Sequence, residues 1–405
     1  MATMAVAGIL WTTSFTAGEE HGKDRWLATW AASPQPDSSP MQITGQTLRQ
    51  IVHVSVGGAR VRVRFSNAYG TSDLVIASAH LALSAGDASI HQGTDRVLRF
   101  GGSPTITIPA GAVVVTDGVA LDVPALGDLA VSLYIVGDVA ATTQHETSMQ
   151  TNYISSPGDF TSATTFAGTP LQSFLFLTGV EVRSSDEGRA VVALGDSLTD
   201  GFGSTPDTNQ RWTNLLADRL QLRRGTSRVG VLNAGIGGNR ILHDLVGSSA
   251  LARLDRDVLA QSGAKYLIVL QGNVDIHLPD LVGIPTQNVT VEQIIQGHQQ
   301  VITRARGMGM RVYGGTLNPV EGFPFPGSWT PTMEQKRQAV NQWIRTSGAY
   351  DAVIDFDVVL RDPAQPSRLR PEYDSGDHVH PNDLGYRAMA AAIPLSLFRK
   401  EAEDD

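Results

Sequence analysis

The sequence predicts an α/β protein in two parts: an antiparallel β-sandwich over residues 25–182 and a parallel sheet covered by helices over residues 190–400. Two observations lead to this prediction. In the first part, short runs of alternating apolar and polar residues are divided by Gly, Pro, Asp and Asn, which is typical of half-buried strands. In the second part, apolar runs alternate with amphipathic helical patterns, which is typical of a buried parallel sheet.

The clearest strand of the first part is ARVRVRFSN. Val61, Val63 and Phe65 are expected to face the core, and the arginines between them to face solvent. TLRQIVHVSVGG, SPTITIPAGAVVVTDG, DLAVSLYIVGD and SFLFLTGVEVR supply further strands, with no convincing helix between them. Many short, closely spaced strands are typical of a sandwich, here expected to be jelly-roll-like. The polar stretch RSSDEGR, residues 183–189, is interpreted as the junction to the second part.

The second part contains the apolar runs AVVAL, VGVLN, YLIVLQG, MRVYGGT and AVIDFD, which we interpret as five strands. A helical pattern follows each run. In TVEQIIQGHQQVITRARG, for example, Ile294, His298 and Val301 fall on one face of a helix. These apolar runs do not alternate strictly, so we expect a parallel sheet that is buried on both faces.

Composition excludes several classes of protein. The 405 residues are 41% hydrophobic and 18% charged, and the formal net charge of −9 argues against a nucleic-acid-binding protein. No window approaches ~18 consecutive apolar residues, so no transmembrane segment is expected. The absence of cysteine excludes disulfides, thiolate metal sites and cysteine nucleophiles.

Residues 1–24 are set apart from the fold. They begin with the apolar run MATMAVAGILW, which lacks a basic region before it, and SFTAGEE is a poor signal-peptidase site. We interpret the segment as the remainder of a signal peptide or as an added tag. This favours a secreted or periplasmic protein and leaves a cytoplasmic one open.

Polar residues follow four of the five predicted strands. In an open parallel sheet, ligands bind outside the carboxyl ends of the strands, so these residues are expected to meet at one edge. Together they offer a hydroxyl, glycine N–H groups, an amide and an acid–base pair, which is the set that acyl transfer requires. The residues in question are Ser197 in GDS, the glycines of NAGIGGNR, Asn273 in QGNVD, and Asp377 with His380 in YDSGDHVHPND.

Asp377 and His380 are spaced so that both side chains can point the same way from one turn. The carboxylate could then hold one imidazole nitrogen and leave the other to take a proton from Ser197. The alternatives are an ordinary turn at Ser197, a solvated loop histidine, and a metal site formed by Asp377, His378 and His380. No HExxH or similar ligand cluster supports the metal site.

The glycine run of NAGIGGNR also has more than one interpretation. It could be a tight turn or a dinucleotide fingerprint, but Arg240 occupies the third glycine position of GxGxxG. Oxyanion stabilisation fits better, because glycine lets a backbone N–H approach a reaction intermediate closely. Neither a GxSxG elbow nor a phosphate-binding loop occurs in the sequence.

Three of these motifs, in this order, resemble the GDSL lipases and esterases, also called SGNH hydrolases. The motifs are GDSLTD, NAGIGGN and DHVHPNDLGY. The resemblance covers about residues 190–398, and the preceding strands look like the extra domain of a two-domain bacterial subgroup. It implies a flavodoxin-like three-layer α/β/α fold. It also implies a nucleophile at Ser197, a base at His380, an orienting acid at Asp377, and oxyanion donors at Ser197 and Gly238.

One motif departs from the family. The usual order after the third strand is Gly-x-Asn-Asp, whereas this chain has Gly272-Asn273-Val274-Asp275. Either Val274 occupies the position of the oxyanion donor, or a shifted loop brings Asn273 into the oxyanion hole. We adopt the second version, and so expect Asn273 to be the third donor.

The sequence therefore predicts a serine esterase that cleaves short acyl or acetyl esters through an acyl-enzyme, without a metal or organic cofactor. Its expected partner is a small ester or an acylated carbohydrate. The alternative is a carbohydrate- or surface-binding protein whose hydrolase half is weakened, as the exchanged Asn273 and Val274 would suggest. The sequence leaves the acyl-chain specificity, the role of the β-domain and the oligomeric state open.

Overall fold

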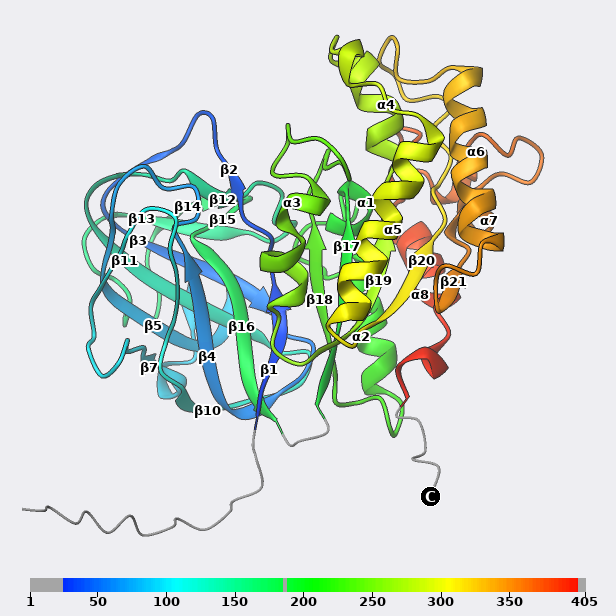
Figure 1. Cartoon of the computed structure of the whole chain (residues 1–405). Helices are drawn as coiled ribbons and strands as arrows, with labels where there is room; N and C mark the ends of the chain where they lie inside the picture. Colours follow the sequence, from blue (N-terminus) through cyan, green and yellow to red (C-terminus); the bar gives the residue numbers. More distant parts are fainter. Residues whose placement is uncertain (1–24, 185–187, 400–405) are drawn as a thin grey trace, which may run out of the picture.

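The computed structural model describes residues 25–184 and 188–399, which form two parts that lie side by side (Figure 1). We call residues 25–184 the β region and residues 188–399 the α/β region. The structure confirms the α/β class, the parallel five-stranded sheet and the antiparallel strands that precede it. The predictions for residues 1–24, and for part of the junction at 183–189, lie outside the described residues.

The β region is built from antiparallel sheets that pack across a common apolar core. The first has the order β1 (Arg25–Ala31), β16 (Leu177–Ser184), β4 (Gly58–Ser66) and β10 (Val119–Val123), with β9 (Val113–Val115) also paired to β4. The second has the order β14 (Gly168–Leu171), β13 (Asn152–Pro157), β3 (Gln42–His53), β11 (Asp128–Ala140), β5 (Leu74–Gly86) and β6 (Ser89–Ile90), with β7 (Arg96–Val97) and β8 (Ile106–Ile108) paired to β5. A small third sheet contains β15 (Phe174–Leu175), β12 (Thr143–His145) and β2 (Gln35–Pro36).

The alternation predicted for β4 is present in the structure. Val61, Val63 and Phe65 are fully buried in the core of the β region. On the other face, Arg62 and Arg64 each donate to the carboxylate of Glu181 on the neighbouring strand at 2.6 Å. Because two guanidinium groups share it, the Glu181 carboxylate can be buried without leaving its charge uncompensated.

The α/β region has a parallel sheet whose first strand lies inside it rather than at its edge. The order is β18 (Val229–Gly235), β17 (Arg189–Gly195), β19 (Ala264–Leu270), β20 (Arg311–Gly315) and β21 (Ala352–Ile354). This is the flavodoxin-like order. The helices are α1 (Ser197–Asp200), α2 (Trp212–Gln221), α3 (Ala250–Leu254), α4 (Asn273–Leu281), α5 (Val291–Gly307), α6 (Pro331–Thr346), α7 (Phe356–Leu360) and α8 (Asp383–Ala392).

Helices cover both faces of this sheet, as the three layers of Figure 1 show. Along β17, Ala190, Val192 and Leu194 pack with α3, α5 and α6, whereas Val191 and Ala193 pack with α2, α7 and α8. Successive strand residues point to opposite faces, so a run of apolar residues fills both layers. None of the described helices has the length and hydropathy needed to cross a bilayer.

The β and α/β regions share a continuous core rather than meeting through a loose linker. Strand β1 packs beside β18, and one hydrophobic cluster contains residues from both regions. Gly230 on β18 permits this approach, because a Cβ there would lie 2.4 Å from the carbonyl oxygen of Ala28. The N–H of Ala28 donates to the carbonyl of Ser262 in the α/β region at 2.9 Å.

Expressing residues 190–405 alone should therefore give an unstable protein. Removal of the β region would expose the apolar surface that now packs beneath β1, and exposed patches of this kind promote aggregation. We expect the fragment to aggregate in size-exclusion chromatography and to lose the cooperative thermal unfolding of the full chain. A soluble and fully active fragment would contradict this expectation.

Candidate active site

Ser197 lies at the sharp turn from β17 into α1, where it is the first helical residue. Asp196 caps the helix, because its carboxylate accepts from the N–H of Leu198 at 3.1 Å. Gly195 is required at the turn, since a Cβ there would lie 2.1 Å from the hydroxyl of Thr199. Asp196 is buried, whereas Ser197 is partly exposed at the carboxyl edge of the sheet.

The structure brings the three predicted residues Ser197, His380 and Asp377 together in one hydrogen-bonded chain. The Ser197 hydroxyl lies 2.7 Å from Nε2 of His380, and Nδ1 of His380 lies 2.6 Å from a carboxylate oxygen of Asp377. With its proton on Nδ1, the His380 ring donates to Asp377, and its Nε2 can accept from the Ser197 hydroxyl. Asp377 and His380 come from the loop before α8. The hydrogen-bonded chain therefore joins this loop, late in the sequence, to the start of α1, where Ser197 lies.

Asp377 is held as a carboxylate by its surroundings. Its second oxygen accepts from the backbone N–H groups of Val379 and His380 at 2.9 and 2.8 Å. Burial raises the pKa of Asp377, but the hydrogen bonds and the charge of His380 outweigh burial and lower the pKa to about 2. An ionised Asp377 fixes the orientation and the tautomer of the His380 ring.

The structure divides the three residues of the alternative metal site between two different pairs. The Nδ1 of His378 lies 2.5 Å from a carboxylate oxygen of Asp374. Asp377, by contrast, pairs with His380. Within residues 25–184 and 188–399, no group of three or more His, Cys, Asp or Glu side chains could hold a metal ion.

Gly238 lies in the tight turn that follows β18. Its φ of +70° is in the left-handed region, which favours glycine. The neighbouring Gly237 N–H donates to the Asp200 carboxylate at 3.0 Å, so the turn is tied to α1, the helix that begins with Ser197. The N–H groups in the first turn of a helix have no intrahelical acceptor, as is the case for Ser197. The role of Ser197 N–H and Gly238 N–H as oxyanion donors stays a prediction.

The Asn273 side chain contacts Asn318. Its amide nitrogen donates to the side-chain oxygen of Asn318 at 2.6 Å and to the Asn318 carbonyl at 3.1 Å. These two contacts direct the amide nitrogen to Asn318 and do not support the expectation that Asn273 is the third oxyanion donor, which stays a prediction. Asn273 is the first residue of α4, and the next residue, Val274, points about 100° away around the helix and is partly exposed.

Asp275 is a residue of this site that our reading of the sequence did not single out. Its buried carboxylate accepts from the N–H groups of Ile241 and Leu242 at 2.8 and 3.2 Å, and so anchors the chain after the glycine turn. Burial raises the pKa of Asp275 to about 6, although these hydrogen bonds and Arg240 oppose the rise. An acid in the first turn of a helix after a buried strand is the signal that could have found it.

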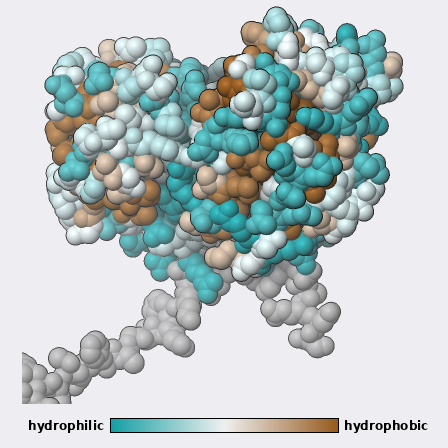
Figure 2. All heavy atoms as spheres, turned by 45° about the horizontal axis from the view of Figure 1, so that its top comes forward, coloured by the Kyte–Doolittle hydropathy of each residue, from teal (hydrophilic) through white to brown (hydrophobic). Residues whose placement is uncertain are grey.

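An exposed aromatic ring lies beside His380. The Phe202 ring centroid is 4.7 Å from that of His380 in an edge-to-face arrangement, and Phe202 is 47% exposed. Figure 2, in which the top of Figure 1 comes forward, shows hydrophobic residues among polar ones on both halves of the molecule. The Phe202 ring therefore offers apolar surface beside His380.

Comparison with known proteins gives a family match within the second half of the chain. Residues 193–388 match the GDSL-like Lipase/Acylhydrolase family. Similar solved structures include a GDSL-like lipase from Bacteroides thetaiotaomicron, with 19% identity over 52% of this chain and 87% of that one and a TM-score of 0.39. An acetylxylan esterase from Geobacillus stearothermophilus has 20% identity over 51% of this chain and 92% of its own, with a TM-score of 0.38. An aryl esterase from M. smegmatis has 17% identity over 51% of this chain and 96% of its own, with a TM-score of 0.38. A comparison with curated proteins finds no match.

Proposed function

Because residues 193–388 form a GDSL-like lipase/acylhydrolase domain, we propose that the protein is a serine esterase that acts through Ser197, His380 and Asp377. The observation that carries this proposal is the continuous hydrogen-bonded chain from Ser197 through His380 to Asp377. Nucleophile, base and orienting acid are within hydrogen-bond reach of one another, which is the arrangement that activates a serine hydroxyl.

In the first half of the reaction, the Ser197 oxygen attacks the ester carbonyl while His380 Nε2 takes the hydroxyl proton. The carbonyl oxygen becomes an oxyanion, to which the N–H groups of Ser197 and Gly238 donate. The C–O bond to the alcohol then breaks. His380 returns the proton to the departing alcohol, and the acyl group stays on Ser197 as an ester. Asp377 stabilises the imidazolium that forms at His380 between these two proton transfers.

In the second half, water replaces the alcohol. His380 takes a proton from the water as its oxygen attacks the acyl carbon, and the same N–H groups hold the second oxyanion. The bond to Ser197 then breaks, His380 returns the proton to the Ser197 oxygen, and a carboxylic acid leaves. Free enzyme is regenerated, and one ester and one water have been converted into an alcohol and a carboxylic acid.

The proposed substrates are short acyl or acetyl esters, including those of carbohydrates. Ser197 is partly exposed and the Phe202 ring stands open to solvent beside His380, so a small ester can approach from the surface. The test is hydrolysis of a p-nitrophenyl ester series of increasing acyl length, with mass spectrometry to detect an acyl group on Ser197. If no member is hydrolysed and Ser197 is never acylated, the proposal fails and the binding-protein alternative gains support.

The Val274→Asn variant should be a better esterase than the natural sequence. Family order puts the side-chain donor of the oxyanion hole at this position, and the natural valine cannot donate. Losing one such donor typically costs about 10²–10³ in turnover, so restoring it should raise kcat by about tenfold or more. KM should change little, because the donor acts on charge that develops in the transition state.

Asn273→Val is the matched comparison for that variant. It removes the contacts with Asn318, so it should lower the unfolding temperature without reproducing the gain in kcat. If Asn273→Val instead lowers kcat sharply and Val274→Asn has no benefit, then Asn273 is the oxyanion donor, as the sequence predicted.

A further inference from the structure

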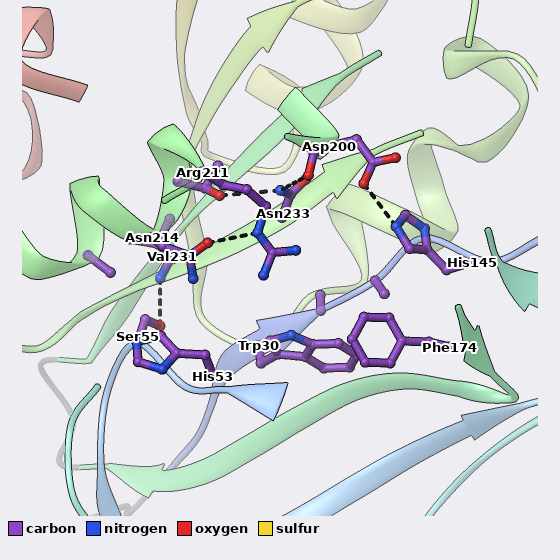
Figure 3. Close-up of a pocket in the computed structure, with 14 residues that line it drawn as sticks. Trp30, His53, Ser55, His145, Phe174, Asp200, Arg211, Asn214, Val231 and Asn233 are labelled. Carbon is purple, nitrogen blue, oxygen red and sulfur yellow. Dashed lines mark hydrogen bonds and ion pairs between the residues drawn. The ribbon is translucent and has the colours of Figure 1, made fainter. Parts of the chain in front are cut away.

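A histidine of the β region contacts the helix that carries Ser197. His145 ends β12, and its Nε2 lies 2.9 Å from a carboxylate oxygen of Asp200 at the end of α1 (Figure 3). The two side chains are only 4% and 2% exposed. Phe174 and Trp30 of the β region lie beneath the histidine in the same view, and Phe174 stacks at a tilt 6.3 Å away. The pair therefore sits in the interior, between the two regions.

Both ring nitrogens of His145 face oxygen atoms. Its Nδ1 lies 3.0 Å from the carbonyl oxygen of Ser33, which can only accept, so Nδ1 carries a proton. Its Nε2 faces the Asp200 carboxylate, which also accepts when ionised. When Asp200 is a carboxylate, both nitrogens donate and the His145 ring is an imidazolium. Burial lowers the pKa of His145, but the charge and hydrogen bond of Asp200 outweigh burial and raise the pKa, against an opposing charge on Arg211.

Asp200 connects this histidine to the glycine turn. One carboxylate oxygen faces His145, and the other accepts from the N–H of Gly237 at 3.0 Å. Gly237 directly precedes Gly238. The Asp200 carboxylate thus connects His145 of the β region with the glycine turn, in which Gly238 carries the N–H predicted as oxyanion donor. Asp200 itself lies on α1, the helix that begins with Ser197. A shift of the carboxylate would move this turn relative to Ser197.

We propose that His145 is a positioning residue for the esterase: it holds Asp200, and Asp200 holds the glycine turn in the place that the oxyanion requires. The β region thereby completes the active site without touching the substrate. This inference rests on the proposed function of Ser197 and deepens it. Oxyanion donors must be preorganised to be effective, so loosening this connection slows the chemical step and leaves substrate binding nearly unchanged.

The first test is the His145→Phe variant, assayed with p-nitrophenyl acetate. Phenylalanine fills the space of the ring and removes the donor to Asp200. We expect kcat to fall about tenfold or more, short of the about 10²–10³-fold loss of a whole oxyanion donor, while KM stays close to its natural value. A role in stability alone would lower the unfolding temperature and leave kcat of the folded protein unchanged.

His80→Phe is the matched control. His80 also belongs to the β region and pairs with an aspartate, Asp95, at 2.9 Å, but that pair lies within the β region. The control should keep the natural kcat. If His80→Phe and His145→Phe lower kcat equally, or if His145→Phe lowers it not at all, the inference is overturned.

Variants of Asp200 give an independent test should His145→Phe not fold. In Asp200→Asn, the amide oxygen can still accept from Gly237, and the amide nitrogen can donate to an unprotonated Nε2 of His145. Asp200→Ala can do neither. We expect Asp200→Asn to retain clearly more kcat than Asp200→Ala, and adding His145→Phe to Asp200→Ala to cost little more, because one connection is already broken. Equal kcat in the two Asp200 variants would refute the inference.

Failure of this inference can be told apart from failure of the proposed function. Hydrolysis that persists in Ser197→Ala would refute the proposed function, and the inference with it. Hydrolysis that disappears in Ser197→Ala but is unaffected by His145→Phe would refute the role of His145 alone.

Discussion

Ser197→Ala should abolish ester hydrolysis, with kcat falling on the order of 10⁶-fold while the protein keeps its fold. In the proposed mechanism, the variant removes the oxygen atom that carries the acyl group. The fold should survive because the Ser197 side chain is partly exposed and its hydroxyl bonds only to His380 among the described residues. Residual catalysis from the remaining oxyanion donors would be small. The measurement is p-nitrophenyl acetate turnover together with circular dichroism.

Ser375→Ala provides the control for this experiment. Ser375 is exposed on the loop that carries Asp377 and His380, and only its backbone N–H contacts His380, at the carbonyl oxygen. We expect natural turnover from this variant. Near-normal turnover in Ser197→Ala would mean that another group is the nucleophile.

Asp377→Asn should lower kcat by about 10⁴-fold, which is the effect of the same change in a well-studied serine protease. An amide nitrogen at this position donates to Nδ1 of His380 and so places the ring proton on Nε2. That nitrogen can then no longer accept from Ser197. The measurement is the kcat of Asp377→Asn, with KM expected to change far less than kcat.

Asp374→Asn is the matched control, because Asp374 pairs with His378 in the same loop without contacting Ser197. It should keep most of its activity. Asp377 also contributes to the dependence of stability on pH. The pKa of Asp377 is lowered from its ordinary value to about 2, so its contribution to stability is present above the ordinary pKa and is lost as the pH falls through about 2. Asp377→Asn should remove that part of the acid sensitivity.

The sequence predicts well what depends on local pattern. The alternation in β4 depends only on residue order, and so does the arrival of Ser197 at the end of β17. Asp377 and His380 lie three residues apart, so their pairing could also be anticipated. The order of the parallel strands followed from the family resemblance rather than from the pattern.

The remaining contacts depend on long-range packing. His145 and Asp200 are 55 residues apart, and nothing in the surrounding TTQHETS distinguishes this histidine from a solvated one. The direction of Asn273 is decided by where α4 begins and by the presence of Asn318, another distant residue. A helix start that differs by one residue exchanges the directions of two side chains, and pattern alone cannot fix it to that accuracy.

The meeting of β1 and β18 also bears on self-association. Strand β18 is an outer strand of the parallel sheet, and the unpaired backbone groups of an outer strand readily recruit another chain. Here the β region occupies that side: the hydroxyl of Ser55 accepts from the N–H of Val231 at 2.9 Å, and Ala28 lies against Gly230. The β region thus covers the edge strand of the sheet that carries Ser197. A bulky residue at Gly230 would displace β1 from β18. The backbone groups of β18 would then be exposed and could pair with a strand of another molecule.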